Sequence, residues 1–286
     1  MTKLTFNDLG LKEGLLKAVT DLGFTTPSDI QAEAIPVALK GQDIIGQAQT
    51  GTGKTAAFGL PMLNNITNRK AISSIILAPT RELAIQVHDE LVKLAKYEKL
   101  NVVAVYGGAP IHNQIRDIKR ANIVVGTPGR VLDHIRRGTL PLDSVEFLVL
   151  DEADEMLNMG FIDDMEEIMK SIPEERQTLL FSATMPAQIK KLTKKYLKED
   201  SVHIVIARKE LTGSTITQNF FEVNNSERFE TLCRLIDFDN PSAGIIFCKT
   251  KKGVDDLVSS MQSRGYMVEG MHGDMSQIQR MKTLAK

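Results

Sequence analysis

Short apolar runs alternate with helical patterns along residues 43–206, and this alternation limits the possible folds more than any other feature of the chain. Each run has the length of a strand buried on both faces, and a helical pattern separates it from the next run. Strands that alternate with helices in this way form a parallel sheet of the α/β class. The predicted strands are Asp43–Gly46, Ser74–Ala78, Asn101–Tyr106, Ile123–Val125, Phe147–Leu150, Thr178–Phe181 and Val202–Ile206.

A glycine-rich loop follows the first of these strands and reads Ala-Gln-Thr-Gly-Thr-Gly-Lys-Thr over residues 48–55. Its glycines let the backbone bend closely around a phosphate, and the helix expected from Thr55 adds the positive end of its dipole. Lys54 can reach the β- and γ-phosphates of a nucleotide, and the Thr55 hydroxyl can bind Mg²⁺. Ala48 departs from the general pattern, which begins with glycine, and the alternative is a turn that binds nothing. The predicted nucleotide ligands are Gln49, Thr50, Gly51, Thr52, Gly53, Lys54 and Thr55.

Two adjacent carboxylates, Asp151 and Glu152, follow the predicted strand Phe147–Leu150. An open parallel sheet places its ligand groups at the carboxyl ends of its strands, which is where both the loop and these acids stand. Neighbouring carboxylates repel each other unless a cation lies beside them. This favours Asp151 as a magnesium ligand and Glu152 as the group that polarises the attacking water. The alternative is an acidic cap on the segment Ala153–Met159. Loop and acids together predict hydrolysis of a nucleoside triphosphate.

The sequence Asp-Glu-Ala-Asp at residues 151–154 also resembles the signature of the DEAD-box RNA helicases, and the wording of the motifs is closest to the bacterial members. Residues 23–31 resemble the family's Q motif, and Phe6 stands at the position of its isolated upstream aromatic residue. Residues 79–84, 107–108 and 127–130 resemble three nucleic-acid-contacting motifs. Residues 182–184, Ser-Ala-Thr, resemble the motif that couples hydrolysis to strand separation. The family's phosphate loop also begins with alanine.

This resemblance implies a RecA-like P-loop NTPase fold, in which helices flank a parallel sheet and a partial second RecA-like domain follows. It also implies ATP and Mg²⁺ as cofactors. Gln31 would read the N6 and N7 edge of adenine, a bidentate fit that guanine does not offer. Phe6 and Phe24 would pack on the adenine ring, and ordinary core packing is the alternative for both.

The resemblance further implies that Asp154 exchanges hydrogen bonds with Ser182 and Thr184. The implied catalytic residues are Lys54, Asp151, Glu152, Asp154, Ser182 and Thr184. The implied RNA contacts are guanidinium, hydroxyl and backbone N–H donors, which suit phosphate oxygens better than base edges. One RNA strand would therefore be bound regardless of its sequence. These contacts would come from Pro79, Thr80, Arg81, Gly107, Gly108, Thr127, Pro128, Gly129 and Arg130.

Length, charge and cysteine usage fit a two-domain cytoplasmic enzyme. The chain has 286 residues, and a domain has about 100–200. Because the net charge is −1, a nucleic acid must bind through a local groove rather than a generally basic surface. Cys233 and Cys248 lack metal-ligand spacing. We find neither a signal peptide nor an apolar run near the ~18 residues of a membrane span, so we expect no membrane partner.

The expected domains are a first RecA-like domain over residues 1–207, a polar linker over 208–217 and the beginning of a second RecA-like domain over 218–286. Within the second domain, strands are predicted at Gln218–Val223, Gly244–Cys248 and Tyr266–Gly270. The lysines between residues 190 and 195 are interpreted as a solvated helix face rather than as an RNA-binding patch.

The segment from His272 to Arg280 resembles the start of the family's second-domain RNA motifs, and the chain ends at Lys286. The family's later His-Arg-x-Gly-Arg-x-x-Arg motif is absent, and its arginine fingers would be worth about 10³–10⁵ in rate. We therefore expect a fragment of a longer RNA helicase that binds ATP and RNA with little turnover. Two alternatives stay open: an ATP-dependent enzyme that acts on DNA or protein, and a nucleotide-gated RNA-binding module without turnover.

Overall fold

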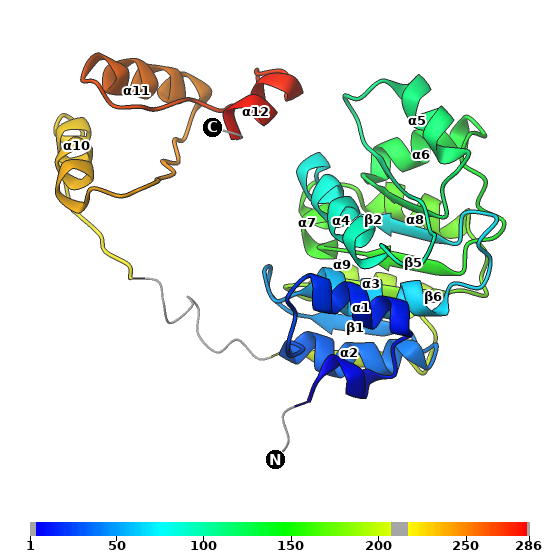
Figure 1. The fold of residues 1–286 in the computed structure, drawn as a ribbon. Helices are drawn as coiled ribbons and strands as arrows, with labels where there is room; N and C mark the ends of the chain where they lie inside the picture. Colours follow the sequence, from blue (N-terminus) through cyan, green and yellow to red (C-terminus); the bar gives the residue numbers. More distant parts are fainter. Residues whose placement is uncertain (1–3, 207–216, 285–286) are drawn as a thin grey trace. The chain divides into compact units, whose positions relative to one another are not determined.

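The computed structural model describes residues 4–206 and 217–284, and the chain divides into two compact units, Met1–Leu211 and Thr212–Lys286 (Figure 1). The predicted linker over residues 208–217 lies outside the described residues except for its last one, so the predicted domain boundaries stay predictions. Within the two described ranges, none of the helices combines the length and the apolar composition that a membrane crossing requires.

The first unit is built on a sheet of seven parallel strands in the order β3-β4-β2-β5-β6-β1-β7. All seven strands predicted for this part of the chain are present, and their ends lie within one residue of the predicted ends. The prediction of a parallel α/β sheet is therefore confirmed. The strands are β1 (Ile44–Gln47), β2 (Ser74–Leu77), β3 (Val102–Val105), β4 (Ile123–Gly126), β5 (Phe147–Leu150), β6 (Gln177–Ser182) and β7 (Val202–Val205).

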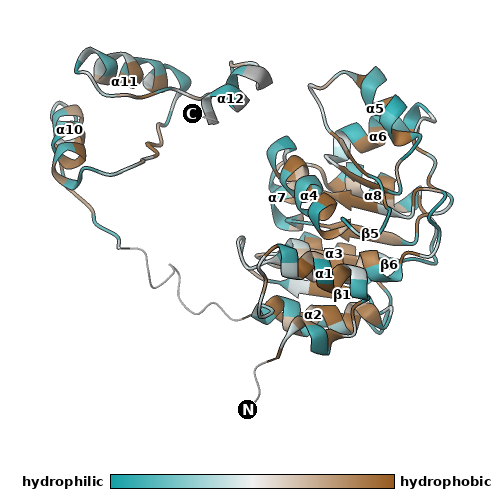
Figure 2. Ribbon diagram, in the orientation of Figure 1, coloured by the Kyte–Doolittle hydropathy of each residue, from teal (hydrophilic) through white to brown (hydrophobic). Residues whose placement is uncertain are grey.

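Helices cover both faces of this sheet, and two apolar clusters fill the space between helices and strands. Ile76 of β2 packs in one cluster, whereas its neighbours Ile75 and Leu77 pack in the other. Because both faces are buried, the strands are continuously apolar instead of alternating with polar residues, as the colouring in Figure 2 shows for β5.

The helices of the first unit differ in how deeply they are buried. Helix α3 is central, since nine of its twelve residues are buried. This burial holds Lys54, its first residue, at a fixed place on the sheet edge. The helices are η1 (Phe6–Leu9), α1 (Glu13–Asp21), α2 (Asp29–Leu39), α3 (Lys54–Asn65), α4 (Arg81–Leu94), α5 (Ile111–Ile118), α6 (Pro128–Arg136), α7 (Ala153–Asn158), α8 (Ile162–Lys170) and α9 (Ala187–Tyr196).

The strand order brings the predicted site segments to one edge. Strand β6 lies between β1 and β5, so the glycine-rich loop after β1 and the acids after β5 are two strands apart. Two strand spacings amount to about 10 Å, a distance that a nucleotide's phosphates can span. The segments that follow β2, β3 and β4 continue the same edge, and they contain the predicted RNA contacts.

The described part of the second unit contains three helices: α10 (Arg228–Asp239), α11 (Lys251–Ser263) and α12 (Gln277–Leu284). The prediction of strands at Gln218–Val223, Gly244–Cys248 and Tyr266–Gly270 is wrong for this structure, because no strand forms within residues 217–284. A strand needs backbone partners on a neighbouring strand, and these three segments do not pair. Their apolar side chains stay in solvent as a result, with Phe220 86% and Phe247 93% exposed.

Candidate functional site

The glycine-rich loop joins β1 to α3, and its shape depends on two glycines. Gly51 and Gly53 have φ angles of 78° and 87°, in the left-handed region that favours glycine. At position 53 a β-carbon would also lie 2.4 Å from Nε2 of Gln31, so a side chain there would collide with helix α2. The hydroxyl of Thr52 donates to the carbonyl of Gln49 at 2.8 Å, which places both residues in the internal structure of the loop.

Two polar side chains at the start of helix α2 hold the loop by hydrogen bonds to its backbone. Ser28 Oγ donates to the carbonyl of Thr52 at 2.7 Å, and Gln31 Nε2 donates to the carbonyl of Gly53 at 3.0 Å. Gln31 Oε1 accepts from the backbone N–H of Ser28 at 2.9 Å. One N–H and one lone pair of the Gln31 amide stay available, which is what a bidentate contact with adenine requires.

The role of Gln31 as a support of the loop was not predicted, although the sequence carries a signal for it. Ser-x-x-Gln at residues 28–31 has the spacing of a capping box at the start of a helix. That spacing turns the glutamine toward the backbone before the helix, where the glycine-rich loop also lies.

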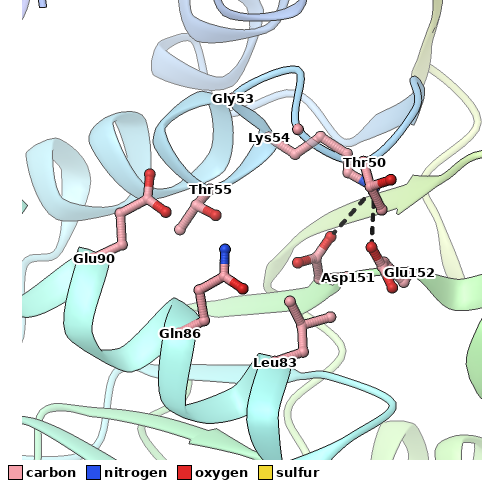
Figure 3. Close-up of a pocket in the computed structure, with 10 residues that line it drawn as sticks. Thr50, Gly53, Lys54, Thr55, Leu83, Gln86, Glu90, Asp151 and Glu152 are labelled. Carbon is pink, nitrogen blue, oxygen red and sulfur yellow. Dashed lines mark ion pairs between the residues drawn. The ribbon is translucent and has the colours of Figure 1, made fainter. Parts of the chain in front are cut away.

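A cavity of about 320 Å³ opens between the loop, helix α4 and the acids after β5 (Figure 3). Lys54 Nζ lies 3.9 Å from Asp151 Oδ1 and 3.9 Å from Glu152 Oε1. Lys54 and Asp151 are buried, with 6% and 3% exposed, and neither Lys54 Nζ nor Asp151 Oδ1 has a hydrogen-bond partner. The cavity-lining residues are Thr50, Gly51, Gly53, Lys54, Thr55, Leu83, Gln86, Glu90, Asp151 and Glu152.

Burial dominates the electrostatics of the acids. It raises the pKa of Asp151 to about 6, against the opposing charge of Lys54 and with the help of the neighbouring Glu152 charge. Burial also raises the pKa of Glu152 above its ordinary value. Both shifts indicate that Lys54 compensates the two negative charges only in part, and a further cation beside them would complete the compensation.

The donor set fits a magnesium ion that is shared with phosphates rather than one held by protein alone. Among residues 4–206 and 217–284, no group of three or more histidine, cysteine, aspartate or glutamate side chains is placed to hold a metal. Mg²⁺ commonly takes one or two protein ligands and completes its shell with water and substrate phosphates. Asp151 and Thr55 supply such a small set.

Glu90 of helix α4 belongs to this site and was not predicted. Burial raises its pKa, and a hydrogen bond with the Thr55 side chain offsets only part of that effect. When the Thr55 hydroxyl donates to Glu90, its oxygen lone pairs stay free for a cation. The i,i+4 spacing of Gln86 and Glu90, which places both on one face of α4, was the signal available in the sequence.

The alternative interpretation of the acids as a simple helix cap is not supported by the geometry. Glu152 occupies the N-cap position of α7, yet its side chain makes no capping hydrogen bond. Its backbone is left-handed, with φ 52° and ψ 52°, and its half-buried carboxylate turns toward Lys54 instead.

Asp154 links this site to the end of β6 through hydrogen bonds with Thr184 and Ser182, as predicted. It accepts from the backbone N–H of Thr184 at 2.9 Å and from the Thr184 hydroxyl at 2.8 Å. Burial alone would raise the pKa of Asp154, but hydrogen bonds from the Thr184 and Ser182 side chains and from the backbone of Thr184 and Ala183 outweigh it and lower the pKa. The Ser182 hydroxyl lies 2.6 Å from the carbonyl of Thr184 and donates to it, so Ser182 shapes the turn that presents Thr184.

The two predicted adenine-stacking aromatics lie together but differ in exposure. Their ring centroids are 6.3 Å apart. Phe6 is 4% exposed and packs in the apolar core, whereas Phe24 is 37% exposed. Packing in the core therefore buries most of the Phe6 side chain, whereas part of the Phe24 side chain stays exposed. Their contact with adenine stays a prediction.

The predicted RNA contacts gather along the neighbouring part of the sheet edge. Thr80 caps α4 by accepting from the N–H of Leu83 at 3.2 Å. The Arg81 guanidinium lies against Gly107 and Gly108, so closely that a β-carbon at position 108 would be 2.4 Å from its Nη1. Pro79 and Pro128 are buried and shape the backbone, while Gly129 is exposed.

Arg130, from the first turn of α6, is more enclosed than its predicted role suggests. Its side chain is 15% exposed, and its Nη1 donates to the carbonyl of Ala109 at 3.1 Å and to Gln114 Oε1 at 3.2 Å. The N–H of Thr127 donates to the carbonyl of Val105 at 3.1 Å. These contacts join the segment 127–130 to residues on either side of the Gly107–Gly108 turn, and Arg81 lies against the turn itself, so the three predicted RNA motifs are close together.

Two family models match the chain. The model of the DEAD/DEAH box helicase matches residues 28–192, which is more than half of the chain. The model of the helicase conserved C-terminal domain matches residues 227–286.

Curated proteins are similar along nearly all of the chain. The ATP-dependent RNA helicase CshA of Listeria monocytogenes is 53% identical, over 100% of this chain and 55% of its own length. The DEAD-box ATP-dependent RNA helicase CshA of Bacillus cereus is 51% identical, over 99% of this chain and 54% of its own length. The chain thus spans about half the length of the curated relatives it matches.

Solved structures of helicases share the fold. A DEAD box protein from Methanococcus jannaschii matches with a TM-score of 0.69 and 46% identity, over 98% of this chain and 76% of that one. Dbp5 of S. cerevisiae, bound to RNA and ADP BeF3, matches with a TM-score of 0.87 and 32% identity, over 98% of this chain and 72% of that one. The predicted RecA-like fold class is thereby confirmed.

Proposed function

This chain belongs to the DEAD/DEAH box helicase family, and on that premise we propose that the protein is an ATP-dependent RNA helicase. It would couple RNA-stimulated ATP hydrolysis to the local separation or remodelling of short RNA duplexes. Because the chain spans about half of its curated relatives, the share proposed for residues 1–286 is the binding of ATP and of one RNA strand. A cytoplasmic location is part of the same proposal.

The observation that carries this proposal is a pair of buried charged atoms in the cavity, Lys54 Nζ and Asp151 Oδ1, which lie 3.9 Å apart and have no hydrogen-bond partner. A buried charge without hydrogen bonds is costly, so a fold keeps one where a ligand completes it. Nucleotide phosphates would pair with the lysine, and a divalent cation would pair with the aspartate. The arrangement therefore favours a magnesium nucleotide over either component alone.

The polar side chains of the site would have different roles in binding and hydrolysis, according to their chemistry. Thr55 and Asp151 would hold Mg²⁺, whose charge offsets that of the phosphates when it is bound. Glu152 would orient the attacking water and draw off its proton, a role that suits a carboxylate with a raised pKa. Gln31 would use its remaining N–H and lone pair on the adenine edge while it keeps its hold on Gly53.

RNA would lie along the edge that carries Arg81, Gly107, Gly108 and the start of α6. The donors there suit phosphate oxygens, so binding would not depend on base sequence. We propose that the bound strand is bent, which costs stacking energy, and that the complementary strand then dissociates. Dbp5 with RNA and ADP BeF3, a structural relative, supports a joint site for RNA and nucleotide.

Turnover by residues 1–286 alone is expected to be weak. The printed sequence contains no His-Arg-x-Gly-Arg-x-x-Arg segment, and arginine fingers contribute about 10³–10⁵ in rate in comparable enzymes. Nucleotide binding does not need that segment, because Lys54, Thr55 and Asp151 all come from the first unit.

The test is steady-state ATP hydrolysis with and without single-stranded RNA. We would compare this chain with a chimera extended by the corresponding C-terminal part of the Listeria monocytogenes relative, and each with its Glu152→Gln variant. We expect RNA-stimulated turnover by the chimera, little by the chain alone and none by either variant. A Glu152→Gln chimera that hydrolysed ATP at the unmodified rate would refute the role of Glu152. Equal stimulation by single-stranded DNA would favour an enzyme that acts on DNA.

A further inference from the structure

A buried hydrogen-bonded group lies behind the predicted RNA-binding edge, between helices α5 and α6. It consists of Gln114, Arg130, His134 and Thr139, and we refer to it as the Gln114 network. His134 is fully buried and Gln114 is 5% exposed. Gln114 Oε1 accepts from Arg130 Nη1 at 3.2 Å and lies 3.1 Å from His134 Nε2, while His134 Nδ1 lies 2.8 Å from the Thr139 hydroxyl.

The chemistry of these partners fixes the orientation of the Gln114 amide and the proton on His134 Nε2. Gln114 Nε2 donates to the carbonyl of Tyr106 at 3.0 Å, so the amide oxygen is the atom that faces His134. An oxygen acceptor requires a proton on His134 Nε2. The Thr139 hydroxyl lies 2.8 Å from His134 Nδ1 and 3.1 Å from the His134 carbonyl, and its single proton can serve one of these two acceptors at a time. Both ring nitrogens of His134 therefore have a partner within the group. Burial and the nearby Arg130 charge lower the pKa of His134, against the opposing charge of Asp133, and this favours the neutral form of the ring.

The Gln114 network holds the Gly107–Gly108 turn at both ends. Gln114 Nε2 binds the carbonyl of Tyr106 just before the turn, and Arg130 Nη1 binds the carbonyl of Ala109 just after it. Within the described residues, the N–H groups of Gly107 and Gly108 donate to no other group. Two carbonyls are thus tied down while the two N–H groups between them stay open, which is the arrangement an anion-binding turn requires.

Arg130 is part of the same arrangement. Gln114 Oε1 and the Ala109 carbonyl together fix its Nη1, so the remaining guanidinium donors point in a set direction. Without Gln114, both the arginine and the turn would lose a partner at once. The network thereby couples two segments that the sequence separates by about twenty residues, each of them a predicted phosphate contact.

We propose that Gln114 and His134 are positioning residues for RNA: they touch no RNA themselves, and they hold the Gly107–Gly108 turn and Arg130 in the geometry that binds the phosphates of one strand. This inference rests on the proposed function. It adds two buried residues to the set of predicted RNA contacts on this edge.

The test measures RNA and nucleotide affinity separately in the chain 1–286. An NMR titration with a short oligouridylate follows the amide signals of Gly107 and Gly108, and mant-ATP fluorescence reports the nucleotide site. We expect Gln114→Ala and His134→Ala to raise the Kd for RNA about tenfold, since each leaves buried partners unsatisfied. The Kd for mant-ATP is expected to stay within about twofold.

Three further variants separate positioning from general stability. His134→Gln restores an amide N–H near the place of Nε2 and is expected to recover most of the RNA affinity. Gln177→Ala is the matched control, because that buried amide also ties two carbonyls, those of Ala38 and Gln42, at the opposite end of the sheet. It is expected to lower the melting temperature without changing the Kd for RNA. If Gln114→Ala does not fold, Thr139→Val removes only the outermost partner and is expected to weaken RNA binding less.

The possible results are distinguishable. Unchanged RNA affinity in folded Gln114→Ala and His134→Ala, or in Thr139→Val if those do not fold, would overturn this inference and leave the proposed function intact. An equal loss of RNA affinity in Gln177→Ala would assign the effect to stability and would also overturn it. A wild-type chain that binds mant-ATP but no oligouridylate would overturn both the inference and the RNA part of the proposed function.

Discussion

Asp151→Asn is expected to stabilise the nucleotide-free chain at alkaline pH, although the residue belongs to the predicted catalytic set. Burial raises the pKa of Asp151 from 3.8 to about 6, so the folded state holds a proton there more tightly than the unfolded state. At about 1.36 kcal/mol for each tenfold difference in proton affinity, the ionised carboxylate costs about 3 kcal/mol of folding free energy. Asparagine resembles the protonated acid and avoids this cost.

The pH dependence of this gain has a definite sign. Above about pH 6, Asp151 is ionised in both states and the full cost applies, so the variant has its largest advantage. Between about pH 6 and pH 4 the folded state takes up the proton first, and the advantage shrinks. Below the ordinary pKa of 3.8 both states are protonated, and the two proteins are expected to have equal stability.

Asp154→Asn is the matched control because its pKa is shifted in the opposite direction. Hydrogen bonds from Thr184 lower the pKa of Asp154 despite its burial, so its ionised form stabilises the fold. That stabilisation is present above the ordinary pKa and is lost as the pH falls through the lowered one. Losing hydrogen bonds to a charged group is expected to cost about 1.5–3 kcal/mol near pH 8.

The assay is urea unfolding in EDTA without nucleotide, at about pH 8 and about pH 5, followed by far-UV circular dichroism. Tyrosine fluorescence reports mainly on the first unit, because Tyr97, Tyr106 and Tyr196 belong to it and Tyr266 does not. The reasoning fails if Asp151→Asn is neutral or destabilising near pH 8 while Asp154→Asn behaves as expected. In that case burial would not dominate the energetics of Asp151.

Three further predictions address the loop and its supports. Lys54→Ala is expected to raise the Kd for mant-ATP by at least about thirtyfold, because it removes a charged partner of the phosphates; unchanged affinity would contradict its role. Gly53→Ala is expected to lower the free energy of unfolding by about 1–2 kcal/mol, measured with urea, because it combines a left-handed backbone with a collision against Gln31. Gln31→Ala is expected to narrow the preference for ATP over GTP about tenfold in competition with mant-ATP, and an unchanged ratio would exclude adenine reading.

The sheet and the two central site segments could be predicted from the sequence because their signals are local. Seven short apolar runs specify strands, and parallel pairing brings the ends of these strands to one edge wherever they stand in the sheet. The glycine-rich loop and the acids after Leu150 needed only to follow a strand to reach that edge. Their chemistry is likewise contained in a few consecutive residues.

Side-chain partners could be predicted less well because they depend on neighbouring helices. Nothing in the order of residues 182–184 predicts that the Ser182 hydroxyl donates to the carbonyl of Thr184 within its own turn. From the sequence, Arg130 is predicted to be a contact to RNA phosphates, but contacts with Ala109 and Gln114 enclose its side chain. The contacts of Arg130 depend on how the segment around α5 is placed beside α6, which no local pattern encodes.

The prediction of strands in the second unit failed for another reason. Its apolar runs have the composition of strands, and composition states only that a segment suits a sheet, not that a partner is present to pair with it. Ile245 and Phe247 are 84% and 93% exposed. This segment therefore has the apolar composition of a strand, but it does not pair with another strand.

The left-handed backbone of Glu152 has a consequence for laboratory evolution of this protein. Among the described residues, only Lys99, Glu152 and Asn240 combine a positive φ with a side chain, and that conformation costs a residue other than glycine about 1–2 kcal/mol. A library selected for heat tolerance alone would therefore accumulate glycine or asparagine at position 152. Each variant selected in this way would lack the Glu152 carboxylate, which lies beside Lys54. Under the catalytic role proposed for Glu152, selection for thermal stability and selection for ATP hydrolysis would favour different residues at this position, and a screen for stability alone would enrich inactive variants.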